Sequence, residues 1–274
     1  MALLHDTIQA AGAVTAAIAN KVDLGDITLG AGQWTITRAW AMVMHAGTIT
    51  AAMGLSGYIR ITSEDCDIAP FEFPLEPVAG PLGTGELEAP IPEPRKYVIN
   101  CKAKGGTVLH VHHIADQTIT TVLSETIVTV EYTAGSSPFP GGQLHMTCGE
   151  PAVTGSTSDG GVVSLTDIGI KAKILRAVIV YIATTTAVAS TGHMLMFEMT
   201  SDDFAQKGPQ RWALNPQRAG GVASNSSGQI SKTLLVEVDM PFGSPGQKQT
   251  ISAEITAYDA VTTGPTVNWC LIWN

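Results

Sequence analysis

The distribution of polar positions along the chain isolates two long apolar runs. Residues 39–59 carry no charged side chain and are flanked by Arg38 and Arg60, and residues 177–197 form a second run of the same kind. Either run is long enough to cross a membrane as a helix. Each is divided, however, by a small polar middle, "HAGTIT" in one and "ATTTAVASTG" in the other. The flanking segments are rich in Val, Ile and Thr, which favour strands. We therefore predict a pair of strands in each run.

The second segment of each run alternates in polarity. "GYIRITS" (57–63) places Arg60 between apolar neighbours, and "MLMFEMTS" (194–201) places Glu198 in the same setting. A period of two indicates a half-buried strand, because successive side chains point to opposite faces of a sheet.

The two runs belong to an internal repeat. Ile36–Asp65 aligns without a gap to Ile174–Asp203, and nine of thirty positions are identical. The identical positions include Arg38 and Arg176, Gly54 and Gly192, and the dipeptides Thr62-Ser63 and Thr200-Ser201. The segments that follow keep the same order in both halves. A Pro- or Gly-rich loop comes first, at Pro70–Arg95 and Gly208–Lys232. Three apolar segments come next: "KYVIN", "TVLHVHHIA" and "TIVTVEY" in one half, and "TLLVEV", "TISAEITAY" and "TVNWCLIWN" in the other. We infer a tandem duplication of one all-β unit.

These patterns divide the chain into four parts. The predicted fold is all-β, with two tandem duplicated antiparallel β-sandwich (jelly-roll-like) units at residues 23–134 and 162–274. A linker rich in Gly, Ser, Thr and Pro is predicted at 135–161. Residues 1–22 are rich in Ala and are predicted to form a short helix, or else an arm that is frayed or bound by a partner.

Composition adds a prediction about the surface. Only 14% of the 274 residues are charged, against about 25% in a typical soluble domain. The mean hydropathy is +0.19. Two small sandwiches with so few charges would expose apolar strands. We therefore expect part of the surface to be buried against other copies of the chain.

Charge and cysteine content narrow the function further. The net charge of -9 opposes general binding to nucleic acid, because phosphate backbones repel it, and no sequence-specific nucleic-acid contact is expected. The sequence is compatible with contact at a membrane surface, but no segment is expected to span the membrane. The spacing of the four cysteines is typical of neither a disulfide framework nor a zinc ribbon. The cysteines therefore do not indicate whether the protein resides in an oxidising or a reducing compartment. The four cysteines are Cys66, Cys101, Cys148 and Cys270.

The paired segments "ITRAWAMVMHAG…GYIRITSED" and "ILRAVIVYIATT…MLMFEMTSDD", with the long loops after them, resemble the tandem (double) jelly-roll major capsid proteins of icosahedral viruses at the level of architecture. The resemblance implies a self-assembling structural protein of the virion. Its partners would be copies of itself, arranged for example as trimers in a larger shell, and other virion proteins. It implies no enzyme activity, no catalytic residue and no cofactor. A subunit of a non-viral extracellular filament or lattice is an alternative.

A histidine cluster supports a second alternative. In "GGTVLHVHHIAD" (105–116), His110 and His112 fall on one face of the predicted strand, where two imidazoles can bind one metal ion. This segment resembles the first cupin motif, with Asp116 where that motif has Glu. The later "PGGQLH" resembles part of the second motif and would supply His145 as a third ligand. A cupin-like metal-dependent enzyme is therefore the alternative function.

The repeat argues against that alternative. The matching segment of the second half, "TISAEITAY", contains no histidine. We therefore expect surface or interface histidines and no metal. For the acidic segments "SEDCD" (63–67) and "SDD" (201–203), turn chemistry is the favoured interpretation and calcium binding the alternative.

Overall fold

The computed structural model describes residues 3–14, 22–46, 57–68, 70–75, 94–115, 119–149, 152–153, 161–183, 195–206, 208–214, 232–242, 247–257 and 266–274. All regular structure in these residues is β-strand, and the strands form four antiparallel sheets. No helix among them is long and apolar enough to cross a membrane.

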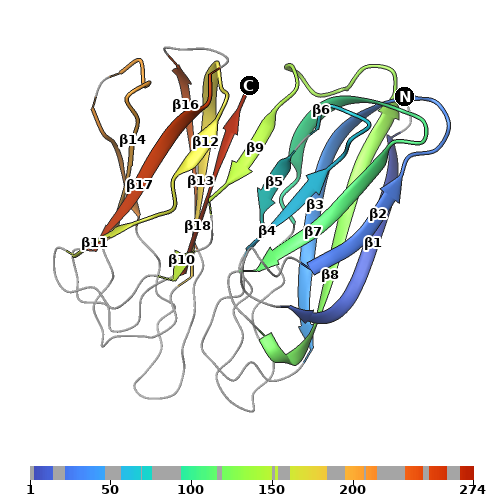
Figure 1. Cartoon of the computed structure of the whole chain (residues 1–274), viewed down its shortest axis with the longest axis horizontal. Coiled ribbons are helices and arrows are strands. Elements are labelled where there is room, and N and C mark those ends of the chain that lie inside the picture. Colours follow the sequence, from blue (N-terminus) through green and yellow to red (C-terminus); the bar gives the residue numbers. More distant parts are fainter. Residues whose placement is uncertain are drawn as a thin grey trace.

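The first two sheets build one sandwich (Figure 1). One sheet has the order β1-β8-β3-β6, with strands at Leu3–Val14, Ile119–Ala134, Gln33–Ala46 and Tyr97–Lys104. The other has the order β2-β7-β4-β5, with strands at Val22–Thr28, Val108–Ala115, Gly57–Thr62 and Phe71–Pro74.

The other two sheets build a second sandwich on the same plan. One has the order β10-β18-β13-β16, with strands at Ala152–Val153, Thr266–Trp273, Ile174–Ala183 and Lys232–Pro241, and β9 (His145–Cys148) also pairs with β18. The other has the order β11-β17-β14-β15, with strands at Gly161–Ser164, Gln249–Ala257, Leu195–Thr200 and Gln210–Leu214, and β12 (Ile168–Ile170) also pairs with β17.

Both sandwiches have jelly-roll connectivity. In the first, β1 pairs with β8, β2 with β7, β3 with β6 and β4 with β5. In the second, β9 and β10 together take the place of β1, β11 and β12 together take the place of β2, and the remaining pairs follow in the same nested order. The predicted all-β fold of two duplicated jelly-roll-like units is confirmed.

Three sequence predictions differ from the structure in detail. The N-terminal helix is wrong, because Leu3–Val14 form the edge strand β1 and pair along β8. Two strands, β9 and β10, lie within the segment predicted as a linker and extend the second sandwich. The two predicted loops each begin with a strand, β5 or β15, while their residues 76–93 and 215–231 lie outside the described part of the chain.

The repeat alignment coincides with the strands. Strands β4 and β14 are 138 residues apart at both ends, as the gapless alignment requires. The identical serines then build the same turn in each half. Ser63 donates its hydroxyl to the Val108 carbonyl and accepts the Asp65 amide, and Ser201 makes the same contacts with Thr250 and Asp203. These contacts support the turn interpretation of the acidic segments.

A matching β-bulge marks the duplication at a position that sequence identity does not show. Between β3 and β6, the ladder places one residue of β3 opposite two of β6, and between β13 and β16 it does the same. The extra residue in each case has a left-handed backbone: Asn100 has φ 57° and Asp239 has φ 39°. Asn and Asp tolerate this conformation better than other non-glycine residues.

We expect Asn100→Val to destabilise the protein by about 1–2 kcal/mol, because a β-branched side chain is strained in the left-handed region. Asn100→Gly removes the same amide group without that strain and is the control, expected to stay within about 0.5 kcal/mol of the parent. Urea unfolding of both variants measures the difference. If both variants lost the same free energy of unfolding, the side-chain hydrogen bonds of Asn100, and not its left-handed backbone, would explain its contribution.

Candidate functional site at the junction of the two sandwiches

The buried core of the first sandwich continues into the second. Its cluster of buried apolar residues includes five from the second sandwich: Met146, Cys148, Ile179, Tyr181 and Cys270. They lie on β9, β13 and β18, and β9 runs between the two sandwiches beside β5 (Figure 1). We call this contact region the junction.

Strands β13 and β18 are consequently buried on both faces. Val178 and Val180 face the core of the second sandwich, and Ile179 and Tyr181 face the junction. On β18, Trp269 and Leu271 face that core, and Cys270 faces the junction. A strand covered on both sides has no solvent face to place polar residues on. This explains why "AVIVYIA" is apolar without alternation, whereas "MLMFEMTS" alternates.

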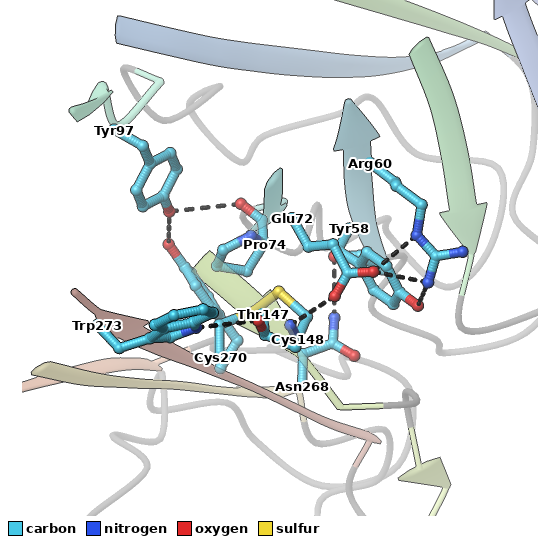
Figure 2. Close-up of a disulfide and its surroundings, with 12 residues drawn as sticks. Tyr58, Arg60, Glu72, Pro74, Tyr97, Thr147, Cys148, Asn268, Cys270 and Trp273 are labelled. Atoms are coloured by element: carbon cyan, nitrogen blue, oxygen red, sulfur yellow. Dashed lines mark hydrogen bonds and ion pairs between the residues drawn. A yellow bond between two sulfur atoms is a disulfide. The ribbon is translucent and has the colours of Figure 1, made fainter. Parts of the chain in front are cut away.

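Polar groups inside the junction are matched across it. The hydroxyls of Tyr97 on β6 and Tyr181 on β13 are 3.0 Å apart, and Tyr97 also donates to the Pro74 carbonyl at 3.4 Å (Figure 2). The side-chain amide of Asn268 on β18 donates to the Gly57 carbonyl at 3.1 Å. A buried polar group without a hydrogen-bond partner lowers the stability of the fold. These bonds therefore fix the relative position of the two sandwiches as well as stabilising the contact between them.

A buried ion pair reaches across the same region. Glu72 on β5 is 3% exposed, and its Oε1 accepts Nε of Arg60 on β4 at 2.6 Å. Its Oε2 accepts the backbone amide of Cys148 on β9 at 2.8 Å (Figure 2). Burial raises the pKa of the Glu72 carboxyl, and the charge of Arg60 and the Cys148 amide oppose that rise. Glu72 therefore connects a charge in the first sandwich to the backbone of the second.

The second sandwich carries the same pair with the charges exchanged. Glu198 on β14 and Arg211 on β15 are cross-strand partners, as Arg60 and Glu72 are on β4 and β5. Their side chains form a salt bridge, but that of Arg211 is 57% exposed. The junction thus buries the carboxylate of one copy of this repeated pair, whereas the arginine of the other copy is exposed to solvent.

A disulfide lies beside the Glu72 contact. Cys148 on β9 and Cys270 on β18 are opposite each other in the ladder and are joined by a disulfide, with a sequence separation of 122 (Figure 2). Next to it, the Trp273 indole donates to Thr147 Oγ1 at 3.1 Å, and the His145 ring stacks on Trp273 at 4.4 Å between centroids. The disulfide and these contacts hold β9 to the sheet that faces the first sandwich.

The three histidines that the sequence analysis singled out lie in different surroundings. His110 Nδ1 lies 2.7 Å from Asp26 Oδ1 at the surface of the β2–β7 pair. His112 is half-buried on the same strand, opposite Arg60 in the ladder. His145 belongs to the second sandwich, against Trp273. Among the described residues, which exclude Asp116, no three His, Cys, Asp or Glu side chains gather as metal ligands would.

We expect the double variant His110→Ala, His112→Ala to change the free energy of unfolding by about 1 kcal/mol or less, because the His110–Asp26 pair is exposed. Metal analysis of the parent protein accompanies the unfolding measurement. Stoichiometric zinc, iron or manganese in the parent, lost together with stability in the variant, would overturn this expectation and favour the cupin-like alternative.

Sequence reasoning did not find Arg60, Glu72 or the Cys148–Cys270 bond as parts of one site. One signal was present for Glu72: a single acidic residue inside "PFEFPL", between two phenylalanines. A lone charge in such a segment indicates a buried, partnered group. The disulfide had no comparable signal, because four cysteines allow three pairings.

No protein-family model matches the sequence, and no curated protein sequence is significantly similar to it. Among solved structures, the chain is similar to that of infectious bursal disease virus strain Gx, with 10% identity and a TM-score of 0.29, over 99% of this chain and 72% of the other. It is also similar to that of strain Gt, with 9% identity and a TM-score of 0.19, over 98% and 75% of the two chains. This is a weak resemblance of overall architecture.

Proposed function

We propose that this protein is a structural subunit that assembles with copies of itself into a shell, as the major capsid protein of a virus does. In this proposal its role is non-enzymatic and needs no cofactor, and its location is the virion. The observation that carries the proposal is the pairing of a rigid two-sandwich body with apolar side chains exposed on its edge strands.

The junction supplies the rigidity. The sandwiches are connected by a continuous apolar cluster, by the contact of the buried Glu72 with the Cys148 amide, and by matched hydrogen bonds. We therefore expect the chain to behave as one rigid building block, or tile, instead of two linked domains. A tile with two similar halves lets three chains imitate a ring of six, which is a means of covering a closed surface.

The edge strands supply the contacts. The large apolar side chains that are exposed among the described residues all lie on edge strands: Leu3 and Leu4 on β1, 37% and 41% exposed, and Val162 on β11, 55% exposed. Strand β1 is twelve residues long, and its one ladder partner among the described strands is β8. Proteins that stay monomeric usually shorten, charge or cover such edges, because an open edge pairs with other chains.

Sedimentation velocity at micromolar concentration tests the proposal. We expect species several times heavier than 28.7 kDa, and we expect the variant Leu3→Lys, Leu4→Lys to shift them toward the monomer, because charge on an edge opposes strand pairing. The control is Gln206→Lys, an exposed position in the turn after β14. A parent protein found only at 28.7 kDa, or a control that dissociates equally, would contradict the proposal.

A further inference from the structure

Strand β1 is attached to the first sandwich from one side of its ladder. It lies at the end of the sheet β1-β8-β3-β6, and its ladder partner among the described strands is β8. None of its described side chains, at residues 3–8, belongs to the buried core cluster, although Ile8 packs partly buried against that core. Detaching this part of β1 therefore takes no fully buried apolar side chain out of the core, where such a loss would be most costly.

Polar side chains match β1 specifically to β8. His5 Nε2 lies 3.1 Å from Glu131 Oε2, the hydroxyls of Thr7 and Thr129 are 3.2 Å apart, and the Tyr132 hydroxyl donates to Asp6 at 2.8 Å. All three contacts join directly opposite positions or their neighbours in one antiparallel register. A β1 strand from a second copy would make the same contacts in the same register, because the side chains of the two strands decide the pairing.

The second sandwich holds the corresponding strand in a different way. On β8, Thr129 lies opposite the third residue after the β3 bulge, and on β18, Cys270 lies opposite the third residue after the β13 bulge. Thr129 is paired with Thr7 of β1, and Cys270 is paired with Cys148 of β9. A hydrogen-bonded pair of threonines in the first sandwich thus occupies the place of the disulfide in the second.

This difference decides which of the two strands can leave its sheet. The disulfide bonds β9 covalently to β18, so β9 cannot be replaced by the same strand of another copy. Residues 3–14 contain no cysteine, and β1 is held to β8 by non-covalent contacts. Exchange of an identical element between protomers needs no contact that the single chain does not already have.

We propose that β1 is exchanged between neighbouring copies of the chain, so that β1 of one copy pairs along β8 of the next. This inference rests on the proposed function, because it names the strand through which copies are joined. The closed and exchanged forms contain the same β1–β8 contacts, so the balance between them depends on the local concentration of neighbouring chains, which assembly raises. Residues 15–21 link β1 to β2 and span at most about 25 Å when extended, so only adjacent copies can exchange.

The test co-expresses two variants of the full chain, Thr7→Cys and Thr129→Cys. A disulfide between the two introduced cysteines forms in register only where β1 of one chain pairs with β8 of another. Mild oxidation, non-reducing electrophoresis and peptide mapping measure this crosslinked dimer. The control pair is Gln206→Cys with Thr129→Cys, since Gln206 is exposed on the second sandwich. We expect the crosslink to exceed that of the control by a factor on the order of a hundred, because paired strands hold the thiols at a far higher effective concentration than free chains do.

A double variant, Thr7→Cys with Thr129→Cys in one chain, gives an independent measurement. It is oxidised in the assembled state and then unfolded without reductant. We expect covalent species of two or more times 28.7 kDa. Covalent species of 28.7 kDa alone, or a co-expressed pair that crosslinks no more than its control, would overturn the exchange. If the parent protein still sedimented as heavier species, the proposed function would stand without this inference, whereas a parent found only at 28.7 kDa would contradict both.

Discussion

Replacing Arg60 with methionine is expected to lower the free energy of unfolding by about 3–5 kcal/mol. Glu72 is 3% exposed, so loss of the guanidinium leaves a buried carboxylate without its counter-charge. The effect depends on pH in a definite direction. Because the pKa of Glu72 in the folded protein is raised above its ordinary value, protonation favours the fold. The variant is therefore weakest above the folded-state pKa of Glu72 and recovers as the pH falls toward the ordinary value of about 4.3.

Two controls isolate the buried charge as the cause. Arg211→Met removes the matching arginine of the second sandwich, which is exposed, and is expected to cost less than about 1 kcal/mol. The double variant Arg60→Met, Glu72→Gln keeps an oxygen that accepts the Cys148 amide but removes the charge, and it is expected to recover most of the loss. Urea unfolding of the three variants gives the comparison. Similar losses in Arg60→Met and Arg211→Met would contradict the account of the junction.

Glu131→Gln is expected to cost about 3 kcal/mol near neutral pH. Glu131 on β8 is 1% exposed, and its carboxylate accepts two hydrogen bonds from Arg38, at 2.9 and 2.7 Å, and one from Thr37 at 2.8 Å. Burial alone would raise its pKa, but the hydrogen bonds from Arg38, Thr37 and His5, with the charge of Arg38, lower the pKa to about 2. A lowered carboxyl pKa stabilises the fold above the unfolded value, and that stability is lost as the pH falls.

The difference between parent and Glu131→Gln is therefore expected to shrink between about pH 4.5 and about pH 2. The repeat offers a control, because Arg176 corresponds to Arg38 and pairs with Asp239, whose side chain is 71% exposed. Asp239→Asn keeps a residue that tolerates the left-handed backbone and is expected to cost less than about 1 kcal/mol, with little dependence on pH. Urea unfolding curves of the parent, Glu131→Gln and Asp239→Asn across this pH range measure these differences in the free energy of unfolding. A gap between the parent and Glu131→Gln that stays constant as the pH falls would contradict the role given to Glu131.

Much of the fold could be predicted from local pattern. Alternation located β4 and β14 to within one residue at each end, because a half-buried strand must alternate, and the repeat placed equivalent strands in both halves. The N-terminal strand could not be predicted in this way. Its alanines favour a helix, and pairing along β8 overrides that preference.

The junction could be predicted only in part. The apolar run of β13 predicted a strand, but it was not used to predict that both faces of that strand are buried or what covers the second face. We expected the low charge content to reflect contact between copies. The structure shows that part of this apolar surface is buried within the chain, on β5, β13 and β18. Contacts between residues far apart in sequence, such as Glu72 and the Cys148 amide, arise only when the two sandwiches pack together. The local sequence pattern therefore contains little information about them.

Electron microscopy of the purified protein tests the proposed function most directly. The account predicts closed shells whose wall resolves into units of two adjacent sandwiches, each unit being one chain held rigid by the junction. Particles of the size of a single 28.7 kDa chain, with no shell at any concentration that the protein tolerates, would contradict it.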